Sequence, residues 1–312
     1  MMHDGHRKLS RRTVLQGMLL TAAATALPSL DALAQEQKPG TRPIPSTGER
    51  LPAVGLGSWI TFNVGNDPVL LKECTAVMEH FFQEGGRMID SSPMYGSSQA
   101  TIGHGLSQLG AIDQVFSTDK IWTSDADDGQ AQSEESRAEW GVPRFDLLQV
   151  HNLVAWEAHL KTLFEMKEAG EVRYVGITTS HGRRHDSFER IMRNEPLDFV
   201  QLTYNVVDRE AEERLLPLAR ERGIGVIVNR PFQQGRLTER LASEPLPAWA
   251  TEVGADSWAQ FILKFIISHP AVTCAIPATT RVDHVRENMA AAGEPLPDDA
   301  MRQRMAAYVR EL

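Results

Sequence analysis

The stretch from Met88 to Ser97 reads Met-Ile-Asp-Ser-Ser-Pro-Met-Tyr-Gly-Ser and joins a short apolar run to reactive side chains. An apolar run of this kind, followed at once by polar and turn-forming residues, is typical of a buried parallel strand that ends in a loop. Asp90 and Tyr95 would then lie at or just past the end of that strand. The same arrangement recurs along the chain, and the recurrence predicts the fold.

From residue 50 onward, short strand-like runs alternate with longer amphipathic stretches, a pattern that predicts a parallel sheet covered by helices. Eight such units favour closure into a barrel, so we expect an α/β fold, a (β/α)8 TIM barrel with an N-terminal β-hairpin and C-terminal helices. The expected strands are residues 53–57, 87–91, 115–119, 146–151, 172–178, 199–204, 225–229 and 272–277. The expected helices are residues 68–83, 98–109, 131–140, 155–168, 182–193, 210–222, 256–268, 282–291 and 298–310.

The main alternative fold is an open, doubly wound sheet, which usually carries a glycine-rich turn after its first strand. Gly55 and Gly57 supply only a Gly-x-Gly, with no third glycine and no helix directly behind them. This is weak support for a Rossmann nucleotide site. Residues 44–51, with a Thr-Gly-Glu turn at their centre, predict a hairpin that could plug the N-terminal end of a barrel.

Capping residues support several of the helix boundaries. Asp67 precedes Pro68 as an N-cap before a first-turn proline, and glycines at 85, 170 and 223 end three helices. The helix at 131–140 is the weakest prediction, because polar residues occupy the stripe that should face a core. Residues 231–254 form a long connection at the end of a strand, which suggests a binding loop.

The overall composition excludes some functions. The formal net charge is -9 and no basic run follows residue 12, whereas phosphate-backbone binding needs clustered positive charge. Nucleic acid is therefore not an expected partner. Two cysteines so far apart form no disulfide framework, so we expect Cys74 and Cys274 to be buried, unpaired thiols. No metal site is expected.

The first 34 residues predict a targeting segment. Residues 10–15, Ser-Arg-Arg-Thr-Val-Leu, resemble the twin-arginine (Tat) export motif, and residues 17–27 form a mild apolar run. That run is shorter than the roughly 20 residues of a spanning helix, so no stable membrane span is expected after cleavage. Ala32-Leu33-Ala34 fits a cleavage site. We therefore expect a signal peptide at 1–34, a barrel domain at 35–312, engagement of the Tat machinery, and a periplasmic or otherwise exported protein.

Reactive side chains gather at the predicted strand ends. Asp90 and Tyr95 follow the second strand, Lys120 ends the third and His151 ends the fourth. Because active sites of parallel barrels lie at the carboxyl-terminal mouth, these four residues are expected to share one rim.

Four segments, in this order along the chain, make the sequence similar to the aldo-keto reductase family. They are residues 88–103, 146–152, 167–180 and 272–288, and the similarity runs from about residue 50 to residue 292. The resemblance implies a barrel that transfers a hydride between NADP(H) and a carbonyl or alcohol substrate.

The resemblance also implies roles for the four residues at the rim. Tyr95 would be the general acid that protonates the carbonyl oxygen. A free tyrosine has a pKa near 10, and an adjacent Lys120 ammonium would make the phenol a better acid. Asp90 would pair with Lys120, and His151 would hydrogen-bond the substrate oxygen.

Cofactor positions follow from the same resemblance. Thr178, Thr179 and Gln201 match positions that hold the nicotinamide carboxamide, although Thr-Thr replaces the more frequent Ser-Asn. The phosphate corner would lie after the last strand. The full set of expected cofactor-binding residues is Gly57, Ser58, Trp59, Thr178, Thr179, Gln201, Asn229, Arg230, Pro231, Phe232, Thr279, Thr280, Arg281, His284, Glu287 and Asn288.

This chain departs from the family at two cofactor positions. Ala278 and His284 stand where members carry a Lys and an Arg for the 2′-phosphate, and Arg281 could compensate because a guanidinium grips phosphate bidentately. Asn229 occupies the place of an aromatic ring that stacks on nicotinamide, so Phe232 stacks instead or nothing does. NADPH is the expected cofactor, with NADH left open.

Two other functions remain open from the sequence. One is an NADP(H)-binding barrel that acts as a redox sensor or partner module with little turnover. The other is an unrelated barrel lyase or aldolase, in which Lys120 forms a Schiff base.

Overall fold

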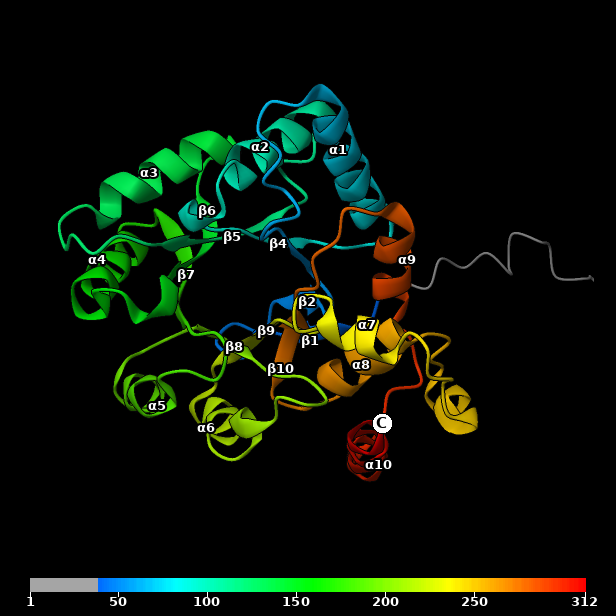
Figure 1. Cartoon of the computed structure of the whole chain (residues 1–312). Coiled ribbons are helices and arrows are strands. Elements are labelled where there is room, and N and C mark those ends of the chain that lie inside the picture. Colours follow the sequence, from blue (N-terminus) through cyan, green and yellow to red (C-terminus); the bar gives the residue numbers. More distant parts are fainter. Residues whose placement is uncertain (1–38) are drawn as a thin grey trace, which may run out of the picture. The chain divides into compact units, whose positions relative to one another are not determined.

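Eight short parallel strands form the centre of the computed structural model, which describes residues 39–312. Each strand pairs with its neighbour in chain order, and the helices lie outside them (Figure 1). The strands are β3 (Leu56–Gly57), β4 (Met88–Asp90), β5 (Phe116–Ile121), β6 (Phe145–Val150), β7 (Val172–Thr178), β8 (Phe199–Thr203), β9 (Gly225–Asn229) and β10 (Val272–Ala275). The twin-arginine motif, the apolar run and the cleavage site after residue 34 lie outside the described residues.

The first and last strands meet and close the barrel. Gly55 N donates to Ala275 O at 2.8 Å, and Gly57 N donates to Pro277 O at 3.0 Å. A Cβ at position 57 would lie 2.8 Å from Ile276 O, so only glycine allows this close approach. The Gly-x-Gly pair therefore serves barrel closure, and the expected (β/α)8 fold is confirmed.

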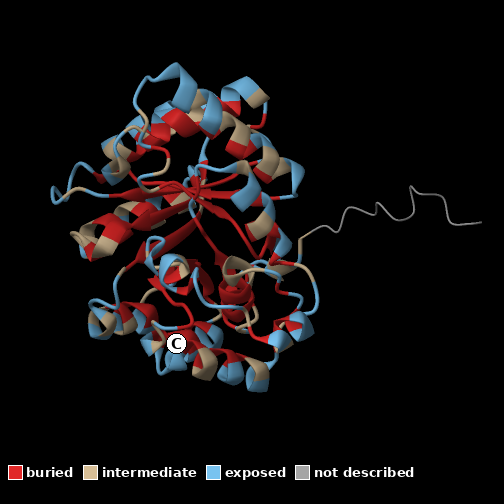
Figure 2. Cartoon of the chain, turned by 45° about the vertical axis from the view of Figure 1, so that its right-hand side comes forward, coloured by how far each residue is buried: buried red, intermediate tan, exposed pale blue. Residues whose placement is uncertain are grey.

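The helices cover the outside of the barrel and turn their apolar faces inward, as the buried inner and exposed outer surfaces in Figure 2 show. They are α1 (Pro68–Gln83), α2 (Ser98–Leu109), α3 (Gly129–Trp140), α4 (Trp156–Glu168), α5 (His185–Asn194), α6 (Leu215–Arg222), α7 (Arg236–Leu241), α8 (Trp258–Ile267), α9 (Val282–Ala290) and α10 (Asp299–Glu311). Short 3-10 helices are η2 (Pro93–Tyr95), η3 (His151–Leu153), η4 (Glu210–Glu212) and η5 (Ala248–Val253).

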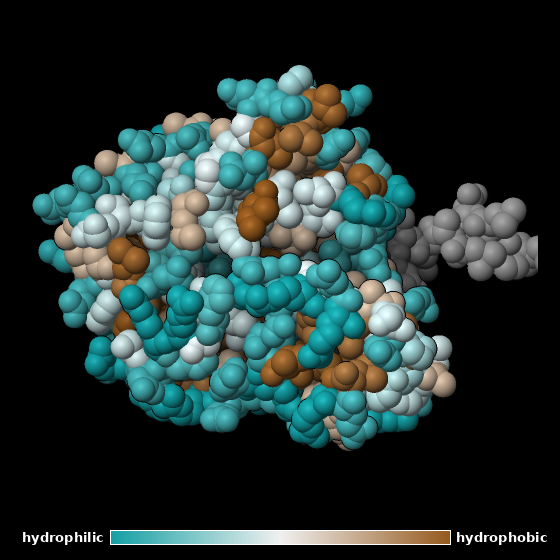
Figure 3. Space-filling view, in the orientation of Figure 1, coloured by the Kyte–Doolittle hydropathy of each residue, from teal (hydrophilic) through white to brown (hydrophobic). Residues whose placement is uncertain are grey.

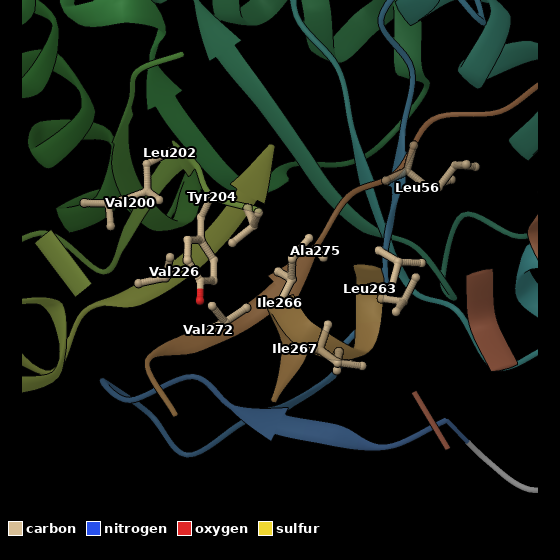
Figure 4. Packing of buried hydrophobic residues seen from close by; sticks show 14 of the residues in the cluster. Leu56, Val200, Leu202, Tyr204, Val226, Leu263, Ile266, Ile267, Val272 and Ala275 are labelled. Carbon is tan, nitrogen blue, oxygen red and sulfur yellow. The ribbon is translucent and has the colours of Figure 1, made fainter. Parts of the chain in front are cut away.

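The layer between strands and helices is apolar. Leu263, Ile266 and Ile267 of α8 are fully buried and lie toward Val272 and Ala275 of β10 (Figure 4). Burial of such side chains stabilises the fold by roughly 1.5–3 kcal/mol each. This packing holds the strand ends, and hence the residues at the mouth, in fixed positions.

The predicted hairpin forms and plugs the bottom of the barrel. Strands β1 (Thr41–Pro43) and β2 (Arg50–Pro52) pair antiparallel. Ile44 and Leu51 are fully buried in the interior cluster, together with barrel residues such as Phe116. The apolar interior at this end leaves the opposite end of the barrel for polar chemistry.

Several boundaries differ from the sequence prediction. The helix expected at 210–222 divides into η4 and α6, because Pro217 fits only in a first turn. The connection at 231–254 contains α7 and η5. Strand β5 runs two residues further than expected, so Lys120 lies within the strand, and β10 ends two residues sooner. Both cysteines are buried and unpaired, as expected.

The weakly predicted helix α3 forms with a polar buried face. Its buried side chains include Ser133, Ser136 and Trp140. Trp140 Nε1 donates to Asp119 Oδ2 at 2.6 Å, and Gln99 Nε2 donates to Ser136 Oγ at 2.8 Å. Hydrogen bonds to neighbouring elements therefore replace the apolar stripe whose absence made this helix hard to predict.

The plug offers a direct test of the interior packing. Leu51→Ala should lower the free energy of unfolding by about 2–5 kcal/mol, because the barrel cannot collapse onto the cavity. Leu70→Ala is the matched control, since Leu70 is 40% exposed on α1, and it should change stability by less than about 0.5 kcal/mol. Urea unfolding measures both. Equal effects of the two substitutions would show that the hairpin does not fill the barrel.

Candidate active site

The structure brings the four predicted rim residues together at the carboxyl-terminal mouth. Asp90 ends β4, Tyr95 ends η2, Lys120 lies near the end of β5, and His151 begins η3 directly after β6. Adjacent parallel strands place these residues side by side, because β4, β5 and β6 are neighbours in the sheet.

A buried ion pair forms the floor of this group. Lys120 Nζ lies 2.7 Å from Asp90 Oδ2, and both side chains are almost completely buried. Lys120 Nζ also donates to Ser91 O at 2.6 Å, while Gln201 Nε2 donates to Asp90 Oδ1 at 2.8 Å. These added hydrogen bonds offset part of the cost of removing two charges from water.

The pair keeps its charges. Burial disfavours the Lys120 ammonium, but the Asp90 carboxylate, with Tyr95, raises the pKa of Lys120 above its ordinary value. Burial raises the pKa of Asp90, while the charge and hydrogen bond of Lys120 act in the opposite direction. We assign Lys120 as an ammonium and Asp90 as a carboxylate at neutral pH. The 2.7 Å distance between Lys120 Nζ and Asp90 Oδ2 is typical of a hydrogen bond between two charged groups.

Tyr95 lies directly above the ammonium. Lys120 Nζ is 5.2 Å from the centroid of the Tyr95 ring. Burial raises the pKa of Tyr95 to about 12, and the Lys120 charge opposes that rise. Tyr95 is therefore a neutral phenol near pH 7, with a cation positioned to stabilise it once its proton has left.

His151 faces Tyr95 edge to face, with ring centroids 5.8 Å apart. Its Nδ1 lies 2.8 Å from Ser92 Oγ, which also accepts from Met94 N at 3.3 Å. Burial, and then the Lys120 charge, lowers the pKa of His151 to about 3. The imidazole is therefore neutral, and a Ser92 hydroxyl that donates to Nδ1 leaves the proton on Nε2.

These groups open onto a cleft of about 750 Å³, within the size range of sites that hold cofactors. Asp90, Tyr95 and His151 line the cleft, whereas Lys120 lies beneath its floor. On the face shown in Figure 3, the side of the hollow near α7 is mainly hydrophilic and the opposite side is more apolar. The expected cofactor residues that line the cleft are Gly57, Ser58, Trp59, Thr178, Thr179, Gln201, Asn229, Arg230, Pro231, Phe232, Thr279, His284, Glu287 and Asn288.

Two expected cofactor residues do not line the cleft. Thr280 and Arg281 are exposed, and Arg281 forms an ion pair with Asp283 on the surface. Asp283, two positions further along the chain, binds the guanidinium, which the sequence prediction did not foresee. Since an ion pair exposed to solvent is weak, Arg281 can leave Asp283 for a stronger anion at little cost.

A polar network across β7, β8 and β9 forms the rest of the floor. Asn229 Nδ2 donates to Thr179 O at 2.9 Å, and Thr203 Oγ1 donates to Asn229 Oδ1 at 2.7 Å. Gln201, fixed by Asp90, completes the network. Amide and hydroxyl groups held in this way suit a carboxamide ligand, and Asn229 therefore anchors the floor in place of an aromatic ring.

Two polar residues that support the rim were not predicted from the sequence. Ser92 contacts His151 and was hidden inside the motif at 88–97. Asp119 lies behind Lys120, where Asp119 Oδ1 accepts from Lys120 N at 2.7 Å. Burial raises the pKa of Asp119 to about 7, although the hydrogen bonds from Gln99 and Trp140 act to lower it. The sequence could have indicated Asp119 through its position directly before Lys120 in the strand.

Residues 39–312 contain neither a metal-binding cluster nor a helix that could span a membrane. No cluster of His, Cys, Asp or Glu in this range is arranged to hold a metal ion. None of the helices in the same range has the length and apolar character needed to cross a membrane.

Fold and site together define a parallel α/β barrel enzyme with buried titratable groups gathered at its carboxyl-terminal mouth. The model of the Aldo/keto reductase family matches residues 53–308. The chain therefore belongs to the aldo/keto reductase family, and the expectation of an oxidoreductase is confirmed.

Individual relatives agree with this assignment. Aldo-keto reductase YhdN of Bacillus subtilis (strain 168) is 27% identical over 219 residues, which cover 64% of this chain and 64% of YhdN, just under two thirds of its length. Methylglyoxal reductase YeaE of Escherichia coli (strain K12) is 26% identical over 247 residues, covering 77% of this chain and 85% of YeaE. An aldo/keto reductase from Klebsiella pneumoniae, solved in complex with NADP and acetate, matches with a TM-score of 0.71 at 21% identity, covering 84% of this chain and 93% of that one.

The buried ion pair predicts strong coupling between its two members. Lys120→Met leaves the Asp90 carboxylate buried without a counter-charge, with only the Gln201 amide as a partner, and should lower the free energy of unfolding by about 3–5 kcal/mol. Adding Asp90→Asn to this variant should restore part of the loss, with a coupling energy of about 0.5–3 kcal/mol. Urea unfolding of Lys120→Met, Asp90→Asn and the double variant gives the coupling energy between the two side chains. Strictly additive effects would mean that the pair is not formed.

Proposed function

We propose that this protein reduces the carbonyl group of an aldehyde or ketone to an alcohol, or catalyses the reverse reaction, with NADP(H) as its cofactor. The proposal rests mainly on Tyr95 and His151, which line the cleft above the Lys120–Asp90 pair and whose ring centroids are 5.8 Å apart. When bound, NADPH supplies the hydride that reduces the carbonyl carbon. All other steps belong to side chains of this chain.

The residues of the cleft fit a nicotinamide dinucleotide. The amides of Gln201 and Asn229 provide donors and acceptors for a carboxamide on the floor. At the other end, Thr279 Oγ1 lies 3.3 Å from His284 Nδ1 beside the start of α9, where the helix dipole favours a phosphate. Arg281 would join these groups after leaving Asp283.

Tyr95 and His151 would share the substrate oxygen. As negative charge develops on that oxygen, the neutral Tyr95 phenol gives up its proton, and the Lys120 ammonium stabilises the phenolate that remains. The neutral His151 ring donates a hydrogen bond from Nε2 and so fixes the direction of the carbonyl. Asp90 keeps Lys120 charged and oriented.

The geometry disfavours one of the two alternatives. A Schiff-base lysine must reach the substrate as a neutral amine, yet Lys120 lies beneath the floor and its pKa is raised. A cofactor-binding sensor would not need the four rim groups to converge, and turnover measurements separate it from an enzyme. The relatives named as reductases support turnover for this chain as well.

Replacement of the phenol tests the proton donor. Tyr95→Phe should lower kcat by about 10²- to 10⁴-fold, because a positioned general acid contributes that much. NADPH affinity, followed by cofactor fluorescence, should stay near the wild-type value. Tyr308→Phe is the control, since Tyr308 lies on α10 and stacks on Trp258. Full activity of Tyr95→Phe across a panel of aldehydes and ketones would refute the proposed role.

We further propose that the chain is exported in its folded state through the twin-arginine pathway. Support comes from the order of Arg11-Arg12, the apolar run and Ala32-Leu33-Ala34 in the sequence. In a bacterial host, an exported barrel should be recovered from the periplasm.

Export can be tested without altering net charge. Arg11→Lys with Arg12→Lys should trap the protein in the cytoplasm, whereas Arg7→Lys should leave export intact. Cell fractionation and immunoblotting measure both, and amino-terminal sequencing of the exported form should begin at Gln35. Periplasmic recovery of the twin-lysine variant at the level of the parent would disprove the proposal.

A further inference from the structure

The hydrogen-bond ladder between β4 and β5 changes its pattern at Lys120. Phe116 N donates to Arg87 O at 2.8 Å, and Ser91 N donates to Thr118 O at 3.0 Å. In a pair of parallel strands the main-chain donors that face one neighbour recur at every second residue. The next donor toward β4 after Thr118 is therefore Lys120 N, and the acceptor that the ladder offers it is Ser91 O.

The side chain of Asp119 replaces that acceptor. Lys120 N donates to Asp119 Oδ1 at 2.7 Å, and Ser91 O accepts instead from Lys120 Nζ at 2.6 Å. No hydrogen bond joins Lys120 N to Ser91 O in the described part of the chain. Because Asp90 Oδ2 lies 2.7 Å from the same Nζ, two acceptors fix the ammonium beneath the Tyr95 ring.

Two helices hold the Asp119 carboxylate in this position. Asp119 Oδ2 accepts from Gln99 Nε2 of α2 at 2.8 Å and from Trp140 Nε1 of α3 at 2.6 Å. Trp140 is fully buried, and Gln99 Nε2 also donates to Ser136 Oγ at 2.8 Å. Neighbouring residues of a strand point to opposite faces, so Asp119 faces the helices while Lys120 faces the barrel interior. The acceptor of Lys120 N is thus anchored outside the barrel.

The Asp119 carboxylate is a costly choice for this place. It is completely buried, and no ion pair within residues 39–312 includes it. Three N–H donors replace only part of the hydration that a carboxylate loses on burial, and apolar residues often pack at such places with equal or better stability. A residue that breaks this rule directly before Lys120 indicates a role at the site rather than in the core.

We propose that Asp119 is a positioning residue that acts through Lys120: by accepting the Lys120 main-chain N–H, it leaves the Ser91 carbonyl free to fix the Lys120 ammonium beneath Tyr95. Asp119 does not line the cleft, so it touches neither substrate nor cofactor. This inference rests on the proposed function, because the place of the ammonium matters for stabilising the Tyr95 phenolate.

Removal of the acceptor is the first test. In Asp119→Leu, Lys120 N returns to Ser91 O, so Nζ loses one of its two fixed partners. The kcat for aldehyde reduction should fall by about 10- to 100-fold, as for a lost hydrogen bond to a charged group, while KM changes little because the cleft is unaltered. Ser136→Ala is the control: it removes a hydrogen bond from the same cluster, leaves the acceptor of Lys120 N in place, and should keep the wild-type kcat.

A rescue variant separates positioning from a purely structural role. In Asp119→Asn a single oxygen remains, and Lys120 N and Trp140 Nε1, both donors, compete for it. Adding Trp140→Phe removes the competing donor and leaves the Asn oxygen to Lys120 N. The double variant should unfold at lower urea than Asp119→Asn, since a buried indole is lost, yet have the higher kcat. A double variant with no higher kcat than Asp119→Asn overturns the inference.

Crystal structures of the variants give a readout that does not depend on activity. The inference requires Lys120 N at hydrogen-bond distance from Ser91 O in Asp119→Leu, and from the Asn oxygen in the double variant. An unmoved Nζ in Asp119→Leu, or a wild-type kcat, overturns the inference and leaves the proposed function intact. If no aldehyde or ketone oxidises NADPH in the wild-type protein, the proposed function fails, and the structures still decide whether Asp119 positions Lys120.

Discussion

The Lys120–Asp90 ion pair is the interaction on which the mouth of the barrel depends. It joins β4 to β5, and Gln201 extends it across the barrel from β8, so three strands are fixed in register around two buried charges. Such a pair adds little net stability compared with well-packed apolar residues. Its value is chemical, because it holds a cation beneath the Tyr95 ring, where the proposed mechanism releases a proton. The fold therefore gives up stability at this place for a preorganised charge.

The rest of the barrel makes that arrangement possible. The hairpin plug and the aromatic residues Phe116, Tyr174 and Phe199 fill the lower interior with apolar side chains. At the mouth, Asp90, Lys120 and His151 each have a hydrogen-bond partner. Ser92 orients His151 from within the same loop that carries Tyr95, and Asp119 supports Lys120 from the outer face of β5.

Much of this could be predicted from the sequence. Strand-helix alternation predicts the barrel, and the ends of three neighbouring strands predict that Asp90, Lys120 and His151 converge, because parallel strands share a rim. Two local effects could not be predicted. Pro217 divides the helix expected at 210–222, and Arg281 forms an ion pair with Asp283 on the surface and does not line the cleft. The hydrogen-bonded cluster around Asp119 was also hidden, since it joins Gln99 of α2 and Trp140 of α3 to a residue of β5. Motif reading finds residues within one segment, whereas such clusters arise only from packing.

The central claim is that one substrate oxygen lies between the Tyr95 phenol and the His151 ring while Lys120 stays on Asp90. The most direct measurement is a crystal structure with NADPH and an unreactive analogue that carries a primary amide in place of the aldehyde. The account predicts the amide oxygen at about 2.6–3.2 Å from both Tyr95 Oη and His151 Nε2. An amide oxygen bound elsewhere in the cleft, or a Lys120 side chain turned away from Asp90, would contradict it.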